Sequence, residues 1–199
     1  IHSPILGGFF GRHFTYGSGN PFPQAIALAK ATGRPVKLVW SREEEFRMDA
    51  MRPLSFTRLK AAIGADGMPT AITSRTVGEG PLGRYFGLTP DSSAVEGITE
   101  KPYAVPNRSM EYLKLPHPVN IAFWRSVGHS MNDFFYEGFL DEIAGAGGRD
   151  PFELRKALLA HSARHLTLLD EVAKISGGWK RGPYDADGTK RARGLAMAS

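Results

Sequence analysis

The 199-residue sequence contains no cysteine, which excludes disulfide bonds, thiolate metal ligands, cysteine-ligated iron–sulfur clusters and cysteine nucleophiles. It also contains no run of 18 or more apolar residues, so we expect no membrane-spanning segment. The first residues lack the basic and apolar regions of a secretory signal. Because a chain without thiols tolerates oxidising and reducing surroundings alike, its cellular compartment stays open.

The motifs of several common functional classes are also missing. The sequence has no P-loop, dinucleotide-binding fingerprint, zinc motif or Gly-x-Ser-x-Gly nucleophile elbow. His161 and His165 have the spacing of helical metal ligands, but no glutamate follows His161, so we interpret them as partly exposed histidines and predict no metal site. The net charge of +5 is spread over the chain rather than gathered with aromatic residues on one stripe, which argues against nucleic-acid binding.

The residues that are present, 42% hydrophobic and 23% charged, are typical of a globular protein. Alternating apolar residues predict strands, at 35–40, 55–64, 69–77 and 108–115. Capping residues and apolar spacing predict helices, over 20–33, from Ser41 to before Pro53, and in a helical part over 129–177 where Met131, Phe135, Phe139 and Ile143 form an apolar stripe and Asp150 caps a second helix. We therefore predict an α+β fold, with an antiparallel or mixed sheet of about four strands and helices mainly on one face.

Two stretches have no apolar periodicity. Residues 1–20 form a Gly-rich segment, and residues 78–107 hold six glycines and four prolines, which predicts a long loop. A loop of this length is normally functional or packs on something outside itself. We expect both stretches to be poorly packed within this chain alone.

Two short runs point to a binding site. Gly-Gly-Phe-Phe-Gly-Arg at 7–12 combines glycines that let a backbone approach a ligand closely with aromatic and basic side chains. Phe-Trp-Arg-Ser-Val-Gly at 123–128 places a cation beside a flat ring just before an expected helix, whose free N–H groups favour an anion. Both suit a phosphate or another oxyanion, with Arg125 donating from its planar fork. An ordinary Gly-rich turn and a stacked loop arginine remain open alternatives on these residues alone.

Six motifs occur in an order that resembles one family. They are Gly-Gly-x-Phe-Gly-Arg at 7–12, Arg-Pro-Val-Lys-Leu-Val-Trp-Ser-Arg-Glu-Glu at 34–44, Met-Arg-Pro at 51–53, Trp-Arg-Ser-Val-Gly at 124–128, Glu-x-Phe-Leu-Asp-Glu-Ile-Ala at 137–144 and Asp-Pro-Phe-Glu-Leu-Arg at 150–155. This order is similar to that of the molybdopterin-binding large subunit of the xanthine dehydrogenase and aldehyde oxidase family, and most of all to its isoquinoline 1-oxidoreductase beta-subunit branch. The resemblance covers nearly the whole chain.

The resemblance implies a cofactor, a reaction and partners. Large subunits of this family bind the molybdopterin cofactor and hydroxylate a small aldehyde or N-heteroaromatic substrate, with water as the oxygen source and an iron–sulfur subunit as electron-transfer partner. The resemblance assigns cofactor binding to Gly8, Phe10 and Gly11, whose backbone would approach the molybdenum ligands. It also assigns cofactor binding to Trp124 and Arg125, which would lie along the pterin, with Trp124 packing the flat side of Arg125.

The resemblance also implies that residues are missing. Phe9 and His13 replace a glycine and an arginine usual in this branch, and the family's catalytic glutamate, near the subunit's carboxyl end, has no match here. We therefore expect an internal fragment, one molybdopterin-binding-type domain over 1–199, with no catalytic residue and no bound cofactor or activity by itself. Other domains of the same subunit would then be its first partners. The alternative is a free-standing, non-catalytic module that binds a phosphate-bearing ligand through the same Gly-rich turn and Arg125.

Overall fold

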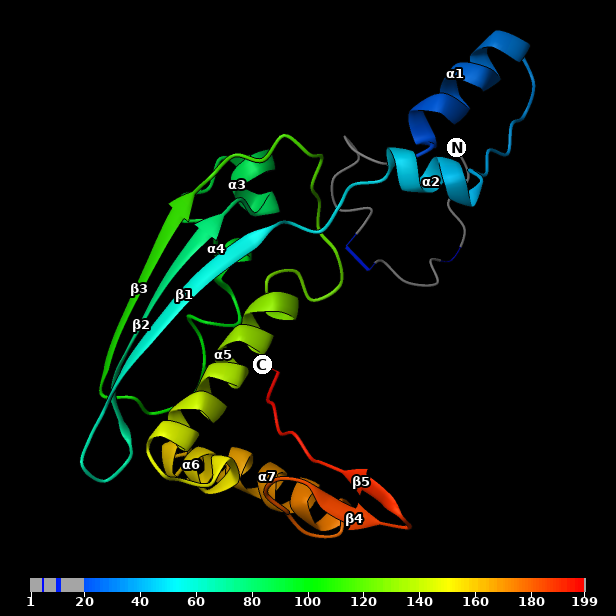
Figure 1. Cartoon of the computed structure of the whole chain (residues 1–199). Helices are drawn as coiled ribbons and strands as arrows, with labels where there is room; N and C mark the ends of the chain where they lie inside the picture. The colour runs from blue at the N-terminus through cyan, green and yellow to red at the C-terminus, as the bar shows by residue number, and fades with distance from the viewer. Residues whose placement is uncertain (1–4, 6–9, 12–19, 199) are drawn as a thin grey trace. The chain divides into compact units, whose positions relative to one another are not determined.

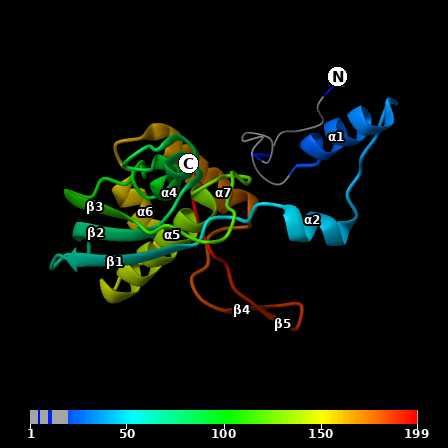
Figure 2. The same ribbon diagram turned by 90° about the horizontal axis from the view of Figure 1, so that it is seen from above.

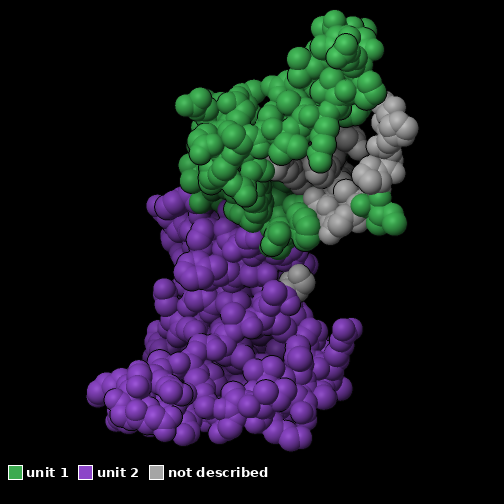
Figure 3. All heavy atoms as spheres, turned by 90° about the vertical axis from the view of Figure 1, so that its right-hand side faces the viewer, with its two compact units in different colours: residues 1–55, 78–94, 114–127 green, residues 56–77, 95–113, 128–199 purple. Residues whose placement is uncertain are grey.

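The computed structural model describes residues 5, 10, 11 and 20–198 (Figure 1). The chain divides into two compact units, which Figure 3 distinguishes by colour. Unit 1 consists of residues 1–55, 78–94 and 114–127, and unit 2 of residues 56–77, 95–113 and 128–199. Since each unit is assembled from three separate stretches, contacts between residues distant in the sequence hold each one together.

Unit 2 contains most of a three-stranded sheet. Its strands are β1 (Ser55–Ile63), β2 (Pro69–Gly78) and β3 (Asn107–Lys114), in the order β1-β2-β3. The predicted hairpin joins β1 to β2, and Gly67 in its turn has a φ of 76°. β3 runs parallel to β2, because contacts between the strands keep a constant offset, from Ser74 to Met110 and from Arg75 to Glu111. The sheet is therefore mixed, as the predicted α+β class allows.

Helix α5 packs on one face of this sheet, and two further helices follow it (Figures 1 and 2). The three are α5 (His129–Ala146), α6 (Pro151–Leu158) and α7 (Ala163–Ile175). Asp150 caps α6 as predicted, since its side chain accepts hydrogen bonds from the N–H groups of Phe152 and Glu153. The core of unit 2 is formed by these buried residues: Ile72, Ile98, Tyr103, Val105, Tyr136, Leu140, Ile143, Ala144, Phe152, Leu154, Leu158, Leu159 and Leu169. This places the helices mainly on one face, and the predicted fold class is confirmed.

The buried face of α5 is rotated from the predicted one. Of the apolar stripe expected to be buried, Ile143 is buried, whereas Met131, Phe135 and Phe139 are only half-buried. The buried residues of α5 are Asn132, Tyr136, Glu137, Leu140, Ile143 and Ala144. The prediction was wrong here because polar side chains that find partners inside the fold occupy the face that an apolar pattern alone assigns to solvent.

Unit 1 carries the remaining helices, α1 (Phe22–Thr32), α2 (Arg42–Met48), α3 (Pro81–Phe86) and most of α4 (Ser92–Val95). Ser41 caps α2 by accepting a hydrogen bond from the N–H of Glu44, which confirms the predicted capping residue. After α2, Met51 pairs in a parallel bridge with Ile121. This bridge brings the segment after α2 alongside the segment that carries the second candidate run.

Two strand predictions were wrong in opposite directions. Residues 35–40 form no strand, because an extended segment becomes one only beside a hydrogen-bonding neighbour. A short antiparallel hairpin, β4 (Tyr184–Ala186) and β5 (Thr189–Arg191), lies in the tail instead. Its turn is Asp187-Gly188, with positive φ at both residues. That dipeptide is a hairpin signal that we did not use.

The stretch 78–107, expected as a long and poorly packed loop, contains the short helices α3 and α4. Within unit 1, the buried carboxylate of Asp91 accepts hydrogen bonds from the N–H of Gly83 and the hydroxyl of Ser93. A Cβ on Gly80 would lie 2.6 Å from the same carboxylate. A buried acid, rather than apolar periodicity, therefore organises this part of the chain, which explains why the sequence pattern missed it.

Unit 2 also buries a charged cluster around Arg155, a side chain with no exposed surface. Its Nε donates to the Glu137 carboxylate at 3.0 Å and its Nη1 to Asp141 at 2.6 Å. Tyr103 donates to Glu137 at 3.0 Å, and the buried Lys101 lies 3.4 Å from the same carboxylate. Each buried charge thus has charged and hydrogen-bonded partners, which is the condition for keeping it inside a protein.

Arg155→Ala is expected to lower the free energy of unfolding by about 3–5 kcal/mol, because it removes the main partner of a buried carboxylate. Urea denaturation of the purified protein measures the change. Lys156→Ala is the matched control, since this neighbour forms only a surface ion pair with Asp170 and should leave the transition nearly unchanged. Equal losses in the two variants would contradict the role of the buried cluster.

Tyr136→Phe is expected to leave stability at neutral pH unchanged or raised, because the buried Tyr136 hydroxyl has no hydrogen-bond partner among the described residues. Burial raises the pKa of Tyr136 from 10.0 to about 12. The unfolded chain therefore loses this proton first, and the native state loses stability as the pH rises from about 10 to about 12. The variant should flatten that loss by up to about 1.4 kcal/mol per pH unit in urea denaturation at stepped pH. A pH profile identical to that of the unchanged protein would contradict this.

Candidate functional site

The second candidate run forms a tight turn in unit 1. The N–H of Val127 donates to the carbonyl of Trp124 at 2.8 Å. Ser126 and Val127 have φ values of 56° and 40°, in the left-handed region that β-branched residues rarely adopt. Such a conformation persists only where the surroundings hold it in place, and it is common at ligand-binding positions.

Of the first run, the structure describes Phe10 and Gly11, whereas Gly8 lies outside the described residues. Gly11 has a φ of 87°, and a Cβ built on it would lie 2.9 Å from the carbonyl carbon of Phe123. No other residue type fits this approach of one backbone to another. The structure thus brings together Phe10, Gly11, Trp124 and Arg125, four of the five residues assigned from the sequence.

Arg125 stacks on a different ring from the one expected. Its guanidinium carbon lies 4.3 Å from the centre of the Phe10 ring, a cation–π contact between the two runs. Trp124, which we expected to pack against the flat side of Arg125, is 41% exposed. Arg125 itself is exposed, so the stacking leaves its charge accessible.

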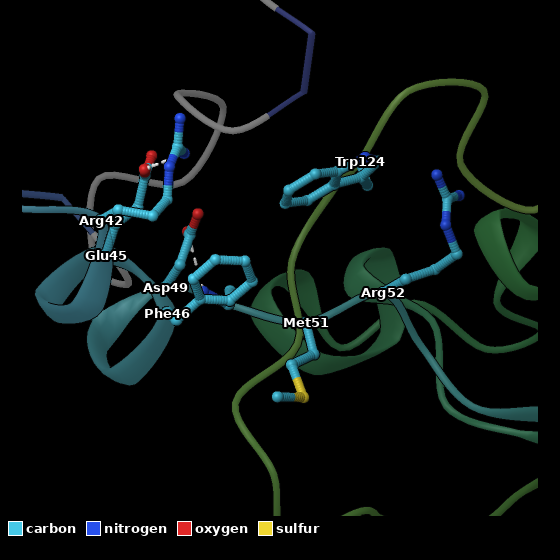
Figure 4. Close-up of a pocket in the computed structure, with 8 residues that line it drawn as sticks. Arg42, Glu45, Phe46, Asp49, Met51, Arg52 and Trp124 are labelled. Carbon is cyan, nitrogen blue, oxygen red and sulfur yellow. Dashed lines mark hydrogen bonds and ion pairs between the residues drawn. The ribbon is translucent and has the colours of Figure 1, made fainter.

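Two hollows meet at Trp124. One has a volume of about 510 Å³ and is lined by Phe10, Gly11 and residues 123–127. The other, of about 420 Å³, lies beside α2 (Figure 4) and is lined by Arg42, Glu45, Phe46, Asp49, Ala50, Met51, Arg52 and Trp124. The first hollow combines rings, a close backbone and one exposed guanidinium. Among the described residues that line it, none is a carboxylate or histidine, so these residues can bind a flat anion but cannot act as a general base.

The helix start after the turn does not provide the anion site that the sequence suggested. In unit 2, the N–H of Gly128, which precedes α5, donates to the carboxylate of Glu96 at 2.7 Å. A protein carboxylate thus already lies at the positive end of the helix dipole. The expectation of an anionic ligand bound there was wrong, and the candidate site is confined to the turn and the Gly-rich run.

The histidine pair shows no metal-site geometry. His165 lies on α7 and contacts Ser162 at 2.7 Å, whereas His161 precedes the helix. Among residues 5, 10, 11 and 20–198, no three His, Asp or Glu side chains are grouped so that they could hold a metal ion. In the same part of the chain, no helix has the length and apolar character to span a membrane.

Sequence reasoning assigned no role to Arg52, which contacts the turn. Its Nη1 donates to the Val127 carbonyl and its Nη2 to the Arg125 carbonyl, both at 3.0 Å. Burial lowers the pKa of Arg52, but a guanidinium stays charged at neutral pH. More than seventy residues separate Arg52 from the turn, so no local signal connects them.

The family model described as the molybdopterin cofactor-binding domain matches residues 1–159. The chain therefore belongs to this family, and the resemblance inferred from the six motifs is confirmed. The candidate residues at 8–11 and 124–125 all fall inside the matched range.

Three similar proteins agree with this assignment. The chain is 30% identical over 204 residues to the isoquinoline 1-oxidoreductase subunit beta of Brevundimonas diminuta, across 98% of this chain and 25% of the relative. It is 31% identical over 160 residues to a probable xanthine dehydrogenase polypeptide of Bacillus subtilis, across 78% of this chain and 20% of the relative. The aldehyde oxidoreductase structure from Desulfovibrio gigas superposes with a TM-score of 0.59 at 25% identity, over 76% of this chain and 16% of its own. The chain thus spans a quarter or less of the length of these proteins.

Gly11→Ala is expected to separate the two runs, because the new Cβ would clash with the backbone of Phe123. Gly33→Ala is the matched control: Gly33 has a φ of 64°, but a Cβ there would have nothing within 4 Å. Both changes carry the left-handed backbone penalty of about 1–2 kcal/mol. Only Gly11→Ala should speed amide hydrogen exchange across residues 121–127. Equal exchange in the two variants would contradict the close approach.

Proposed function

We propose that this chain is part of a molybdenum hydroxylase subunit, in which the hollow beside Phe10 and Gly11 binds the molybdopterin cofactor. The observation that carries the proposal is the exposed Arg125 guanidinium, stacked on Phe10 where the Gly11 backbone meets the Phe123 peptide. The membership of the chain in a cofactor-binding family supports the same assignment.

The described residues fit the chemistry of this cofactor. A pterin is flat and its phosphate is anionic, and the hollow offers aromatic rings and a planar cation for these two parts. The room kept free by the missing side chain of Gly11 allows backbone to lie close to a ligand. We assign pterin and phosphate contacts to Trp124 and Arg125, and backbone contacts to Gly8, Phe10 and Gly11.

When bound, the cofactor supplies the two-electron redox chemistry at molybdenum. This chain's part is to bind and orient the cofactor, because the described residues at the hollow include no proton-transfer group. The general base would come from the remainder of the subunit, and the 199 residues alone would be inactive. The coverage of a quarter or less of the relatives supports this division.

We further propose an aldehyde or N-heteroaromatic substrate for the complete protein. The names of the relatives, an isoquinoline oxidoreductase and an aldehyde oxidoreductase, support these substrate classes. Electrons would leave through an iron–sulfur partner, since this chain has no cysteine to ligate such a cluster.

Arg125→Ala in the full-length protein is expected to weaken cofactor retention by roughly 10- to 150-fold, the worth of one charge-assisted hydrogen bond. Molybdenum per folded subunit, measured by elemental analysis after dilution and gel filtration, gives the result. Arg42→Ala is the control, because Arg42 is an exposed arginine of the same unit that pairs with Glu45 on α2. Full molybdenum content in Arg125→Ala would show that the cofactor site lies elsewhere.

A further inference from the structure

We propose that Arg52 is a positioning residue, which holds the turn at 124–127 in the strained shape that presents Arg125 and thereby sets the affinity for the cofactor. This inference rests on the proposed function of Arg125. It assigns a role to a side chain that lines the neighbouring pocket beside α2 (Figure 4).

The first argument is the geometry of the contact. The two terminal nitrogens of Arg52 each donate to a different carbonyl of the turn, those of Arg125 and Val127, at 3.0 Å. These carbonyls flank Ser126, so the planar guanidinium spans the residue at which the chain turns. A rigid fork that contacts both sides fixes the relative orientation of two peptide groups, which a single flexible donor cannot do.

The second argument is that this turn needs such a restraint. Ser126 and Val127 both have left-handed φ values, and valine is among the residues least suited to them. The hydrogen bond within the turn, from the Val127 N–H to the Trp124 carbonyl, is compatible with other conformations of the two residues between. Without the fork of Arg52, the strain would relax by rotating these peptides, and Arg125 would move with them.

The third argument is that Arg52 is itself held in place. The N–H of its neighbour Met51 donates to the carbonyl of Asn120 at 2.8 Å, and the Met51 carbonyl accepts from the N–H of Ala122 at 3.1 Å. The next residue, Pro53, is buried. The backbone of Arg52 is therefore fixed against the chain that leads into the turn, so its side chain starts from a fixed point.

The same unit offers a matched control. Arg84 also donates to two carbonyls of one short segment, those of His117 and Val119, and it pairs with Glu79. Its segment carries none of the residues assigned to the cofactor. Arg52 and Arg84 thus use the same chemistry on neighbouring parts of one loop, and only Arg52 acts on the proposed site.

The experiment compares Arg52→Lys with Arg84→Lys in the full-length protein. Lysine keeps the charge and loses the planar fork. Arg52→Lys is expected to weaken molybdenum retention by about tenfold or more, the effect of losing one hydrogen bond from a charged donor. It should also speed hydrogen exchange at the Val127 amide in protein without cofactor. Arg84→Lys should change neither measurement, although both variants lower the thermal midpoint.

Val127→Asn gives a second, independent variant, because asparagine tolerates left-handed backbone. In the Arg52→Lys background it is expected to restore part of the lost molybdenum, which a merely structural role of Arg52 would not produce. Unchanged molybdenum in Arg52→Lys, equal losses in both lysine variants, or no recovery with Val127→Asn would each overturn the inference. If Arg125→Ala retains full molybdenum, the proposed function fails instead, so the two failures are distinguishable.

Discussion

Buried backbone groups outside helices and strands need hydrogen-bond partners, and this constraint shapes both units. The chain has 23 glycines and 14 prolines, so much of its backbone runs through turns and connections. Charged side chains supply the missing partners: Asp91 accepts from the Gly83 N–H, Glu79 accepts from the His117 N–H, and Arg52 donates to two carbonyls. Irregular segments are thereby as fixed as the elements they connect.

The candidate site uses the same constraint for function. Its two halves come from segments more than a hundred residues apart, and each is unusual in its backbone rather than in its side chains. Gly11 meets the Phe123 peptide with no space for a Cβ, and Val127 adopts a conformation that valine avoids. Fixed peptide groups and one exposed cation suit a cofactor that brings its own reactivity and needs to be oriented.

Features determined by neighbouring residues could be predicted from the sequence. Ser41 and Asp150 cap the helices that follow them, and Gly67 forms the hairpin turn, because a few adjacent residues settle each outcome. The six motifs also identified the family. Contacts over long separations could not be predicted in this way: Arg125 stacks on Phe10 rather than on the adjacent Trp124. Residues 35–40 have the alternation of a strand but no neighbouring strand, which is decided elsewhere in the chain.

The parallel pairing of β3 with β2 has a consequence for folding. A parallel neighbour cannot follow through a tight turn, so the chain runs from 79 to 106 before β3 begins, and residues 79–94 of that connection belong to unit 1. Closing so long a connection costs entropy before the pairing is formed, whereas the β1-β2 hairpin needs only a local turn. The hairpin therefore forms early and β3 joins late. Since the chain enters unit 1 and returns before the sheet of unit 2 is complete, the two units cannot be made one after the other as a ribosome extends the chain.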